Sequence, residues 1–138
     1  MSFDFAKFMN VVNTLIQING HDEAYCRCAV SRTFYVAWHN AQDYLHTEKN
    51  LKNIHTRDGV IELYTKSPHA PTRKIGLELK TFNTRRNEAD YNQNPVKIFN
   101  KKNTESFIED VHKLIADISF IKSTQPKFLA PQPTRTAP

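Results

Sequence analysis

This chain of 138 residues has only three glycines and two cysteines. No run of apolar residues approaches the roughly 18 that a membrane-spanning helix requires, and the N-terminus lacks the basic and apolar regions of a secretory signal. We therefore expect a single soluble domain in the cytoplasm, without a membrane segment. The seven prolines leave long stretches without a helix breaker, which predicts helices.

Several motifs that carry common chemistry are also absent. The sequence has no Walker loop, no Gly-rich dinucleotide turn, no Gly-x-Ser-x-Gly elbow and no His-Glu-x-x-His helix. Cys26 and Cys28 are too few for a disulfide scaffold, and their spacing places them on nearly opposite faces of a helix. None of the six histidines forms a metal-ligand spacing with this pair. We therefore expect no metal and no cofactor.

The positive charge of the chain is concentrated in its middle. The formal net charge is +5 and the isoelectric point is about 9.3. Between positions 49 and 102 the sequence has 12 Lys and Arg against 5 Asp and Glu. Such a stretch suits an anionic partner such as RNA, DNA or an acidic protein, and it equally suits a solvated surface of helices and loops. The charge alone leaves both interpretations open.

Hydrophobic periodicity predicts five helices. The first covers about residues 4–19, and Asp22 is positioned to cap a second helix that reaches about residue 48. Thr56 is the expected N-cap of a short third helix that ends before Pro68, and Thr72 is that of a fourth helix that ends before Pro95. A last helix follows residue 102. The core stripes expected for the fourth and last helices are Ile75, Leu79, Phe82, Arg86 and Ala89, and Phe107, Val111, Leu114, Ile118 and Ile121.

The predicted fold is an all-α, antiparallel bundle of about five helices that occupies residues 1–123. Four of the seven prolines lie beyond Ser123, where little could pack against a core. Residues 124–138 are therefore expected to form a disordered tail.

The most informative position is Arg86, an arginine within the apolar stripe of the fourth helix. Burial of a guanidinium costs several kcal/mol unless the group is paired, so the position requires a partner or an open cleft. Asp90 lies one turn further on the same face, and mutual neutralisation of the two is one interpretation. Arg85, Asn87 and Tyr91 surround the pair, and this set of groups also suits phosphate recognition. Both interpretations stay open.

The second helix carries a polar stripe of its own, in which Arg32, His39, Asp43 and His46 fall on one narrow face. His39 beside Asp43 is a candidate general base, because an imidazole titrates in the neutral range. The solvent-facing side of any amphipathic helix has the same composition, so a solvated face is the alternative.

Two segments, taken together, resemble one superfamily. The segment 31–39, which reads Ser-Arg-Thr-Phe-Tyr-Val-Ala-Trp-His, resembles the second-helix signature of HEPN-domain proteins. The segment 86–91, which reads Arg-Asn-Glu-Ala-Asp-Tyr, resembles the Arg-x-x-Ala-Asp-Tyr motif of one branch of that superfamily. His55 also resembles a His that often opens the third helix in this branch. The resemblance spans about residues 5–121 in order and spacing.

The resemblance implies a helical bundle that dimerises and places polar residues of the two chains in a shared cleft. Many HEPN proteins are metal-independent ribonucleases of toxin–antitoxin, CRISPR-associated or other defence systems, in which an Arg, a polar residue and a His act on RNA. Arg86 and Asn87 match the first two positions, whereas Tyr91, Asn92 and Gln93 stand where the His would fall. The imidazole that would take the proton from a ribose 2′-hydroxyl is therefore missing from its usual place.

A cleft between the second and fourth helices is one way to complete such a site. In that interpretation arginines hold phosphate, and His39 or Tyr91 acts as acid or base. In the other interpretation Arg32 and Asp90 form an interhelical salt bridge that holds the bundle together. The candidate catalytic residues are Arg86, Asp90, Tyr91 and His39, and the candidate RNA-binding residues are Arg32, Arg85 and Asn87.

Two functions follow as hypotheses. The first is a HEPN-like RNA-binding protein of a prokaryotic defence or toxin–antitoxin system, which acts as a metal-independent endoribonuclease if it cleaves. The alternative is a non-catalytic, dimerising subunit that pairs with a nucleotidyltransferase or a larger effector encoded nearby. Binding through the basic middle would weaken steeply with salt in the first case.

Overall fold

The computed structural model describes residues 7–19, 22–47, 51 and 53–124. These residues form five helices and no strand, in the order α1 (Lys7–Asn19), α2 (Glu23–Thr47), α3 (Arg57–Thr65), α4 (Ala70–Tyr91) and α5 (Lys101–Thr124). The prediction of an all-helical bundle of five helices is confirmed. The expected tail lies outside the described residues from position 125 onward, as do the first three positions of the expected first helix.

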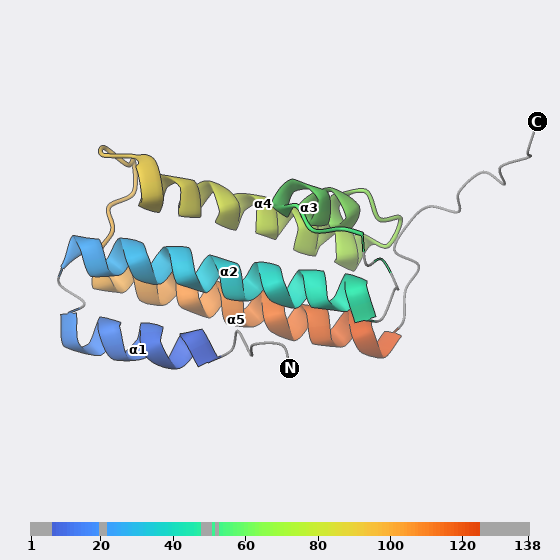
Figure 1. Ribbon diagram of the computed structural model, residues 1–138, viewed down its shortest axis with the longest axis horizontal. Helices are drawn as coiled ribbons and strands as arrows, with labels where there is room; N and C mark the ends of the chain where they lie inside the picture. Colours follow the sequence, from blue (N-terminus) through green and yellow to red (C-terminus); the bar gives the residue numbers. More distant parts are fainter. Residues whose placement is uncertain (1–6, 20–21, 48–50, 52, 125–138) are drawn as a thin grey trace, which may run out of the picture.

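α2 is the centre of the bundle and contacts each of the four other helices. In Figure 1, α1 lies on one side of α2, α3 and α4 lie on the other, and α5 runs alongside. α1 and α4 run antiparallel to α2, whereas α5 has the same direction as α2. A helix that is covered on most sides needs apolar residues around most of its circumference, and the buried side chains of α2 follow its whole length. Within the described ranges, no helix is long and apolar enough to cross a membrane.

Two helices begin at the capping residues that the sequence predicts. The Asp22 carboxylate accepts a hydrogen bond from the backbone N–H of Ala24 at 2.8 Å, at the start of α2. The Thr56 hydroxyl accepts one from the backbone N–H of Gly59 at 3.0 Å, at the start of α3. Each cap satisfies a donor that the first helical turn leaves without a partner, so both boundaries follow from local chemistry.

The predicted start of the fourth helix is wrong. α4 begins at Ala70, with His69 as its N-cap, and the expected cap Thr72 is buried inside the first turn. Pro71 lies in that turn, where a missing N–H costs nothing because no intrahelical acceptor exists for it. The proline therefore belongs to the helix instead of preceding it.

The two predicted core stripes of α4 and α5 are buried at every position, Arg86 included. α3 and α4 approach each other closely at Gly76, where a Cβ atom would lie 2.5 Å from the backbone nitrogen of Thr65. Only a residue without a side chain allows this approach. The short helix α3 is thereby held against α4, next to the polar residues described below.

Candidate functional site

Arg86 lies in a polar cluster between α2 and α4, and only 3% of the residue is exposed. Its Nη1 donates to Asp90 Oδ2 at 3.1 Å, which makes an ion pair along the helix between a buried guanidinium and a partly exposed carboxylate. Its Nη2 donates to the side-chain oxygen of Asn83 at 3.3 Å and to that of Asn87. The guanidinium is therefore neutralised and held by residues of its own helix, as the spacing of Arg86 and Asp90 predicts.

Aromatic rings enclose the same guanidinium. Its Cζ lies 5.9 Å from the ring centroids of Phe34 and Tyr35 on α2, and 6.0 Å from that of Tyr91. Ring faces attract a cation and replace part of the water that burial removes. The Nε of Arg86 is buried and finds no hydrogen-bond acceptor among the described residues. One donor of this arginine thus stays unsatisfied.

α2 contributes Ser31, Tyr35 and His39, which share one face because they are spaced by four residues. The Ser31 hydroxyl donates to Asp90 Oδ2 at 3.3 Å, so one carboxylate oxygen ties α2 to α4. The Tyr35 hydroxyl accepts a hydrogen bond from Nη1 of Arg57, the first residue of α3, at 3.1 Å. The ring of His39 lies 6.5 Å from that of Tyr35. Three helices therefore meet at this cluster.

His39 has the electrostatics of a proton acceptor. Burial lowers the pKa of its imidazole below the ordinary value of 6.5. A hydrogen bond with the Gln42 side chain raises the pKa, but this effect is the smaller one. The ring is therefore neutral at neutral pH, and a neutral imidazole accepts a proton. The sequence suggests Asp43 as the neighbour of His39, whereas the side-chain hydrogen bond that affects its pKa comes from Gln42.

Arg32, an expected RNA-binding residue, lies apart from this cluster. It is exposed on the side of α2 that faces α1, and its Cζ lies 5.6 Å from the ring of Phe8. The expected interhelical contact to Asp90 is made by the neighbouring Ser31 through a hydrogen bond. One residue along a helix corresponds to a rotation of about 100°, which separates these two neighbours.

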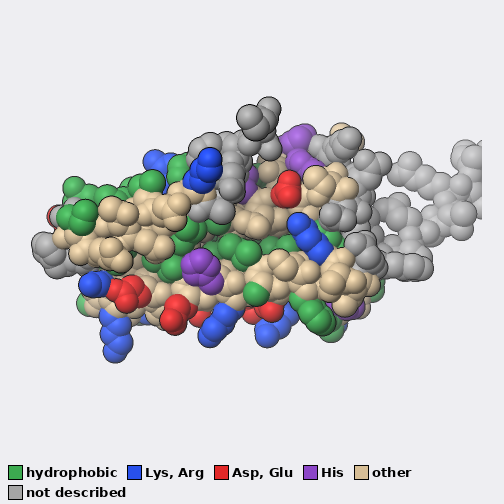
Figure 2. Space-filling view, turned by 90° about the horizontal axis from the view of Figure 1, so that it is seen from below, with side chains coloured by type: hydrophobic (Ala, Val, Ile, Leu, Met, Phe, Trp, Pro, Cys, Tyr) green, Lys and Arg blue, Asp and Glu red, His purple; other side chains and the backbone are tan. Residues whose placement is uncertain are grey.

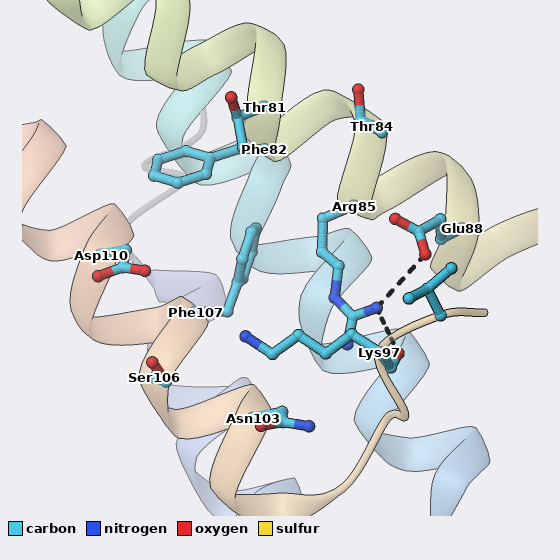
Figure 3. Close-up of a pocket in the computed structure, with 11 residues that line it drawn as sticks. Thr81, Phe82, Thr84, Arg85, Glu88, Lys97, Asn103, Ser106, Phe107 and Asp110 are labelled. Atoms are coloured by element: carbon cyan, nitrogen blue, oxygen red, sulfur yellow. Dashed lines mark hydrogen bonds and ion pairs between the residues drawn. The ribbon is translucent and has the colours of Figure 1, made fainter.

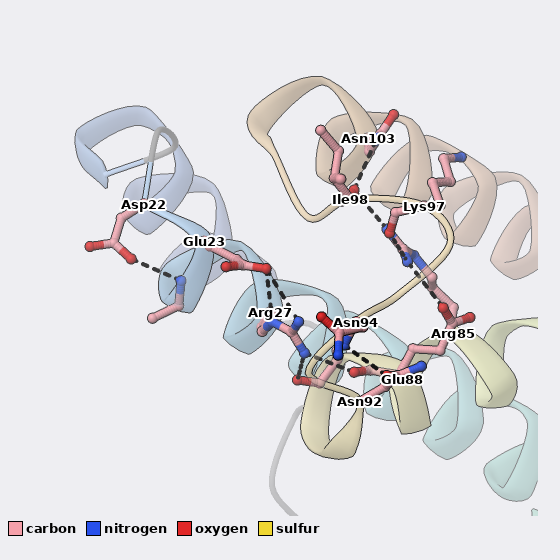
Figure 4. A network of polar contacts seen from close by, with 12 residues as sticks. Asp22, Glu23, Arg27, Arg85, Glu88, Asn92, Asn94, Lys97, Ile98 and Asn103 are labelled. Carbon is pink, nitrogen blue, oxygen red and sulfur yellow. Dashed lines mark hydrogen bonds and ion pairs between the residues drawn. The ribbon is translucent and has the colours of Figure 1, made fainter.

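Arg85 is committed to the connection between α4 and α5. Its Nη1 donates to the carbonyl of Lys97 at 2.7 Å and its Nη2 to that of Ile98 at 3.1 Å, as Figure 4 shows. It also pairs with Glu88 at 3.7 Å. Burial lowers the pKa of its guanidinium, Glu88 raises it, and the charge of Arg27 lowers it further. Because both Nη groups are used, Arg85 stabilises the fold and has little left for a phosphate.

The cluster and the sequence-based candidates overlap in part. The structure brings Arg86, Asn87, Asp90 and Tyr91 together and places His39 at the margin, while Arg32 and Arg85 lie elsewhere. The sequence did not single out four members of the cluster, which are Ser31, Tyr35, Arg57 and Asn83. The contact of Asn83 with Arg86 is predictable from their spacing of about one helical turn. No local pattern predicts the contact of Arg57 with Tyr35, because it forms only when α3 packs on α2.

No family model, no curated protein and no solved structure matches this chain. The chemistry of the α2–α4 cluster, and the resemblance of two segments to HEPN-domain proteins, are therefore the grounds on which a function is inferred.

Proposed function

We propose that this protein is a HEPN-like RNA-binding protein that contacts single-stranded RNA with the outer face of α4, next to the Arg86 cluster. The observation that carries the proposal is the position of Tyr91. The residue is 78% exposed, yet its ring centroid lies 6.0 Å from the buried Arg86 Cζ. A ring that lies beside a guanidinium and is otherwise open to solvent provides a stacking surface for a base.

The outer face of α4 offers the other groups that RNA binding uses. Lys80, Thr84, Asn87 and Tyr91 follow at spacings of four, three and four residues, and all of them are exposed. An ammonium suits a phosphate, a hydroxyl and an amide suit ribose and base edges, and the ring suits stacking. Among the described residues, Lys80 has no ion-pair partner and is available to a phosphate.

Lysines are the expected phosphate contacts, because the arginines of the basic stretch at positions 49–102 bind other groups of the protein. Arg57 donates to the Tyr35 hydroxyl, and Arg73 donates to the carbonyls of Ser67 and Pro68 at 3.0 and 2.8 Å. The face turned downward in Figure 1 is a poorer surface for RNA, since acidic and basic side chains alternate along its edge in Figure 2. These observations favour the outer face of α4.

Cleavage is a separate part of the proposal. In it, the neutral imidazole of His39 takes the proton of a ribose 2′-hydroxyl, in place of the His that the HEPN nuclease motif would supply. Arg86 is too buried to touch a phosphate, so it acts as a positioning residue for Asp90 and Asn87. Such a reaction needs no metal and is expected to continue in EDTA.

The proposal extends to the setting of the protein. As the resemblance implies, we expect a cytoplasmic homodimer from a prokaryotic defence or toxin–antitoxin system. A second candidate function is the non-catalytic subunit that pairs with a nucleotidyltransferase or a larger effector. The observation that favours it is the engagement of the Arg86 Nη groups by Asn83, Asn87 and Asp90, which is what a purely structural arginine would show.

Fluorescence anisotropy with a short labelled single-stranded RNA tests the RNA-binding proposal. Tyr91→Ala is expected to weaken binding about tenfold, because loss of one stacked base costs roughly 1–3 kcal/mol. Phe120→Ala removes another exposed aromatic ring, on α5, and is expected to leave the affinity unchanged. Lys80→Ala is expected to reduce the slope of log affinity against log salt by about 0.7, the value for one phosphate of a single strand.

Two outcomes would decide against this function. If the wild type does not bind RNA at low salt, or if Tyr91→Ala and Phe120→Ala weaken binding equally, the non-catalytic subunit becomes the better hypothesis. Incubation of the wild type with RNA in EDTA tests cleavage, with His39→Asn as the variant that should lose it. Circular dichroism of each variant checks that the helices are intact.

A further inference from the structure

A pocket of about 450 Å³ lies between α4, α5 and the connection that joins them. Figure 3 shows Phe82 and Phe107 side by side in it, and their ring centroids lie 5.3 Å apart. Lys97 extends into the pocket from the connection, and Ser106 and Asp110 line it from α5. The volume is within the range of pockets that hold a ligand or an inserted side chain, and the two phenylalanines give it an apolar wall.

The connection that borders this pocket is held by polar contacts to its backbone. Arg85 donates to the carbonyls of Lys97 and Ile98, and Asn103 Nδ2 donates to the carbonyl of Ile98 at 2.9 Å. Figure 4 shows these bonds converging on the connection from α4 and α5. A segment with its backbone bonded in this way is already ordered before any partner arrives, which lowers the entropic cost of binding.

Side chains of the same connection divide between the core and the solvent. Phe99 is buried, with the guanidinium carbons of Arg27 and Arg85 at 4.6 and 3.7 Å from its ring centroid. Val96 and Ile98 are exposed, and Val96 also lines the pocket. Two exposed apolar side chains thus belong to a connection that borders a pocket with an apolar wall, which is typical of a surface that another molecule covers.

The connection and the first turn of α5 carry unpaired positive charge at the edge of the pocket, whose own lining is balanced by Arg85 and Lys97 against Glu88 and Asp110. Lys97, Lys101 and Lys102 belong to a stretch, positions 91–104, that contains no acidic residue. Lys101 pairs with Glu105 at 3.9 Å, whereas Lys97 and Lys102 have no ion-pair partner in the part of the chain that the structure describes. Lys97 lines the pocket, and Lys102 lines an adjoining hollow that shares Ser106 with it, so a partner that brings carboxylates would find one available ammonium group in the pocket and a second beyond its edge.

We infer that the pocket and the connection form a docking surface for an acidic protein segment. The segment inserts a large hydrophobic side chain against Phe82 and Phe107 and places carboxylates on Lys97 and Lys102. A bilayer would not fill a concave pocket, and a sugar-phosphate backbone has no hydrophobic side chain to place against Phe82 and Phe107. This surface meets the outer face of α4 at Thr84, whereas Lys80, Asn87 and Tyr91 are not among the residues that line the pocket. The inference holds whether or not the protein binds RNA.

A synthetic peptide tests this inference on the full-length protein. The probe is a short fluorescein-labelled peptide with a central Phe-Leu pair flanked by Asp and Glu, and the control peptide carries Gly-Gly in place of Phe-Leu. We expect the first peptide to bind in fluorescence anisotropy and the control to bind at least about tenfold more weakly, because the apolar contact supplies much of the affinity.

Two variants and a matched control locate the binding site. Lys97→Glu is expected to weaken peptide binding about tenfold, because an attraction becomes a repulsion. Lys7→Glu makes the same charge change at an exposed position of α1 and should leave the affinity nearly unchanged. Ser106→Trp, from an exposed position of α5 that lines the pocket, should abolish binding by filling it. Circular dichroism and the thermal midpoint verify that each variant is folded.

Three results would overturn the inference: no binding of the Phe-Leu peptide by the wild type, equal losses in Lys97→Glu and Lys7→Glu, or binding to phosphatidylserine vesicles in place of the peptide. Tyr91→Ala should keep full peptide binding, and Ser106→Trp should keep full RNA binding. A failure of the docking surface is thereby distinguished from a failure of the RNA-binding proposal.

Discussion

The two members of the Arg86–Asp90 ion pair are expected to contribute unequally to stability. Arg86 is 3% exposed, whereas the side chain of Asp90 is 29% exposed. Asp90→Ala leaves a buried guanidinium whose remaining contacts are amide oxygens and aromatic rings. Arg86→Met removes the buried charge and keeps a long apolar stem, while the carboxylate left behind retains water and the Ser31 hydroxyl.

The magnitudes follow from this difference in exposure. Removing one partner of a fully buried pair costs about 3–5 kcal/mol. Because water reaches Asp90, we expect Asp90→Ala to cost less than the loss of a partner in a fully buried pair, about 2–3 kcal/mol. For Arg86→Met we expect about 1 kcal/mol, since methionine fills most of the space and the oxygens of Asn83 and Asn87 lie near enough to solvent to bond water.

Urea unfolding followed by circular dichroism measures both free energies by linear extrapolation. Glu105→Ala serves as the control, because the Lys101–Glu105 pair is 55% exposed on both sides and should contribute no more than about 0.5 kcal/mol. The reasoning is refuted if Arg86→Met destabilises the protein as much as Asp90→Ala or more. Such a result would mean that the guanidinium contributes by its contacts and not by its need for a counter-charge.

Three further predictions concern stability. Gly76→Ala should cost about 2 kcal/mol in urea unfolding, because its Cβ would meet the backbone of Thr65 and separate α3 from α4; an unchanged midpoint would contradict the close approach. Burial lowers the pKa of His39 in the folded state, so the unfolded chain binds the proton more readily. The free energy of unfolding should therefore fall as the pH drops from about 6.5, the ordinary pKa, to below the pKa of the folded state. His39→Asn should make this fall shallower in urea midpoints measured across that range, and equal slopes would exclude His39 as a source. Tyr64→Phe should cost about 1 kcal/mol, since the buried hydroxyl donates to the carbonyl of Ala41 at 2.8 Å; burial raises the pKa of Tyr64 well above its ordinary value, which keeps the donor protonated.

The fold was predictable because its signals are local and repeated. The stripe from Phe107 to Ile121 recurs with helical period and is buried at every position. The caps Asp22 and Thr56 each accept a hydrogen bond from a backbone N–H within three residues. Residues so close along the chain are also close in space, so the sequence alone indicates such a contact. The start of α4 is not predictable in the same way, because a proline such as Pro71 is compatible both with a position before a helix and with its first turn.

The candidate site was predictable only along α4. Arg86 and Asp90 are one turn apart, so their ion pair follows from helix geometry. Whether Ser31 or Arg32 contacts Asp90 depends on how α2 is rotated about its axis. Consecutive side chains of a helix point about 100° apart, so a modest rotation changes which of the two faces α4. Periodicity predicts which face is apolar, and it does not distinguish polar neighbours at the edge of that face.

By itself, the sequence determined the five helices, their inner faces and the need of Arg86 for a counter-charge, because each depends on residues within a turn or two of one another. Only the tertiary structure decided that Arg57 reaches Tyr35 and that Arg85 binds the α4–α5 connection. It also placed the pocket beside the exposed Val96. These features join positions that lie far apart along the chain, and their contacts exist only once the helices have packed.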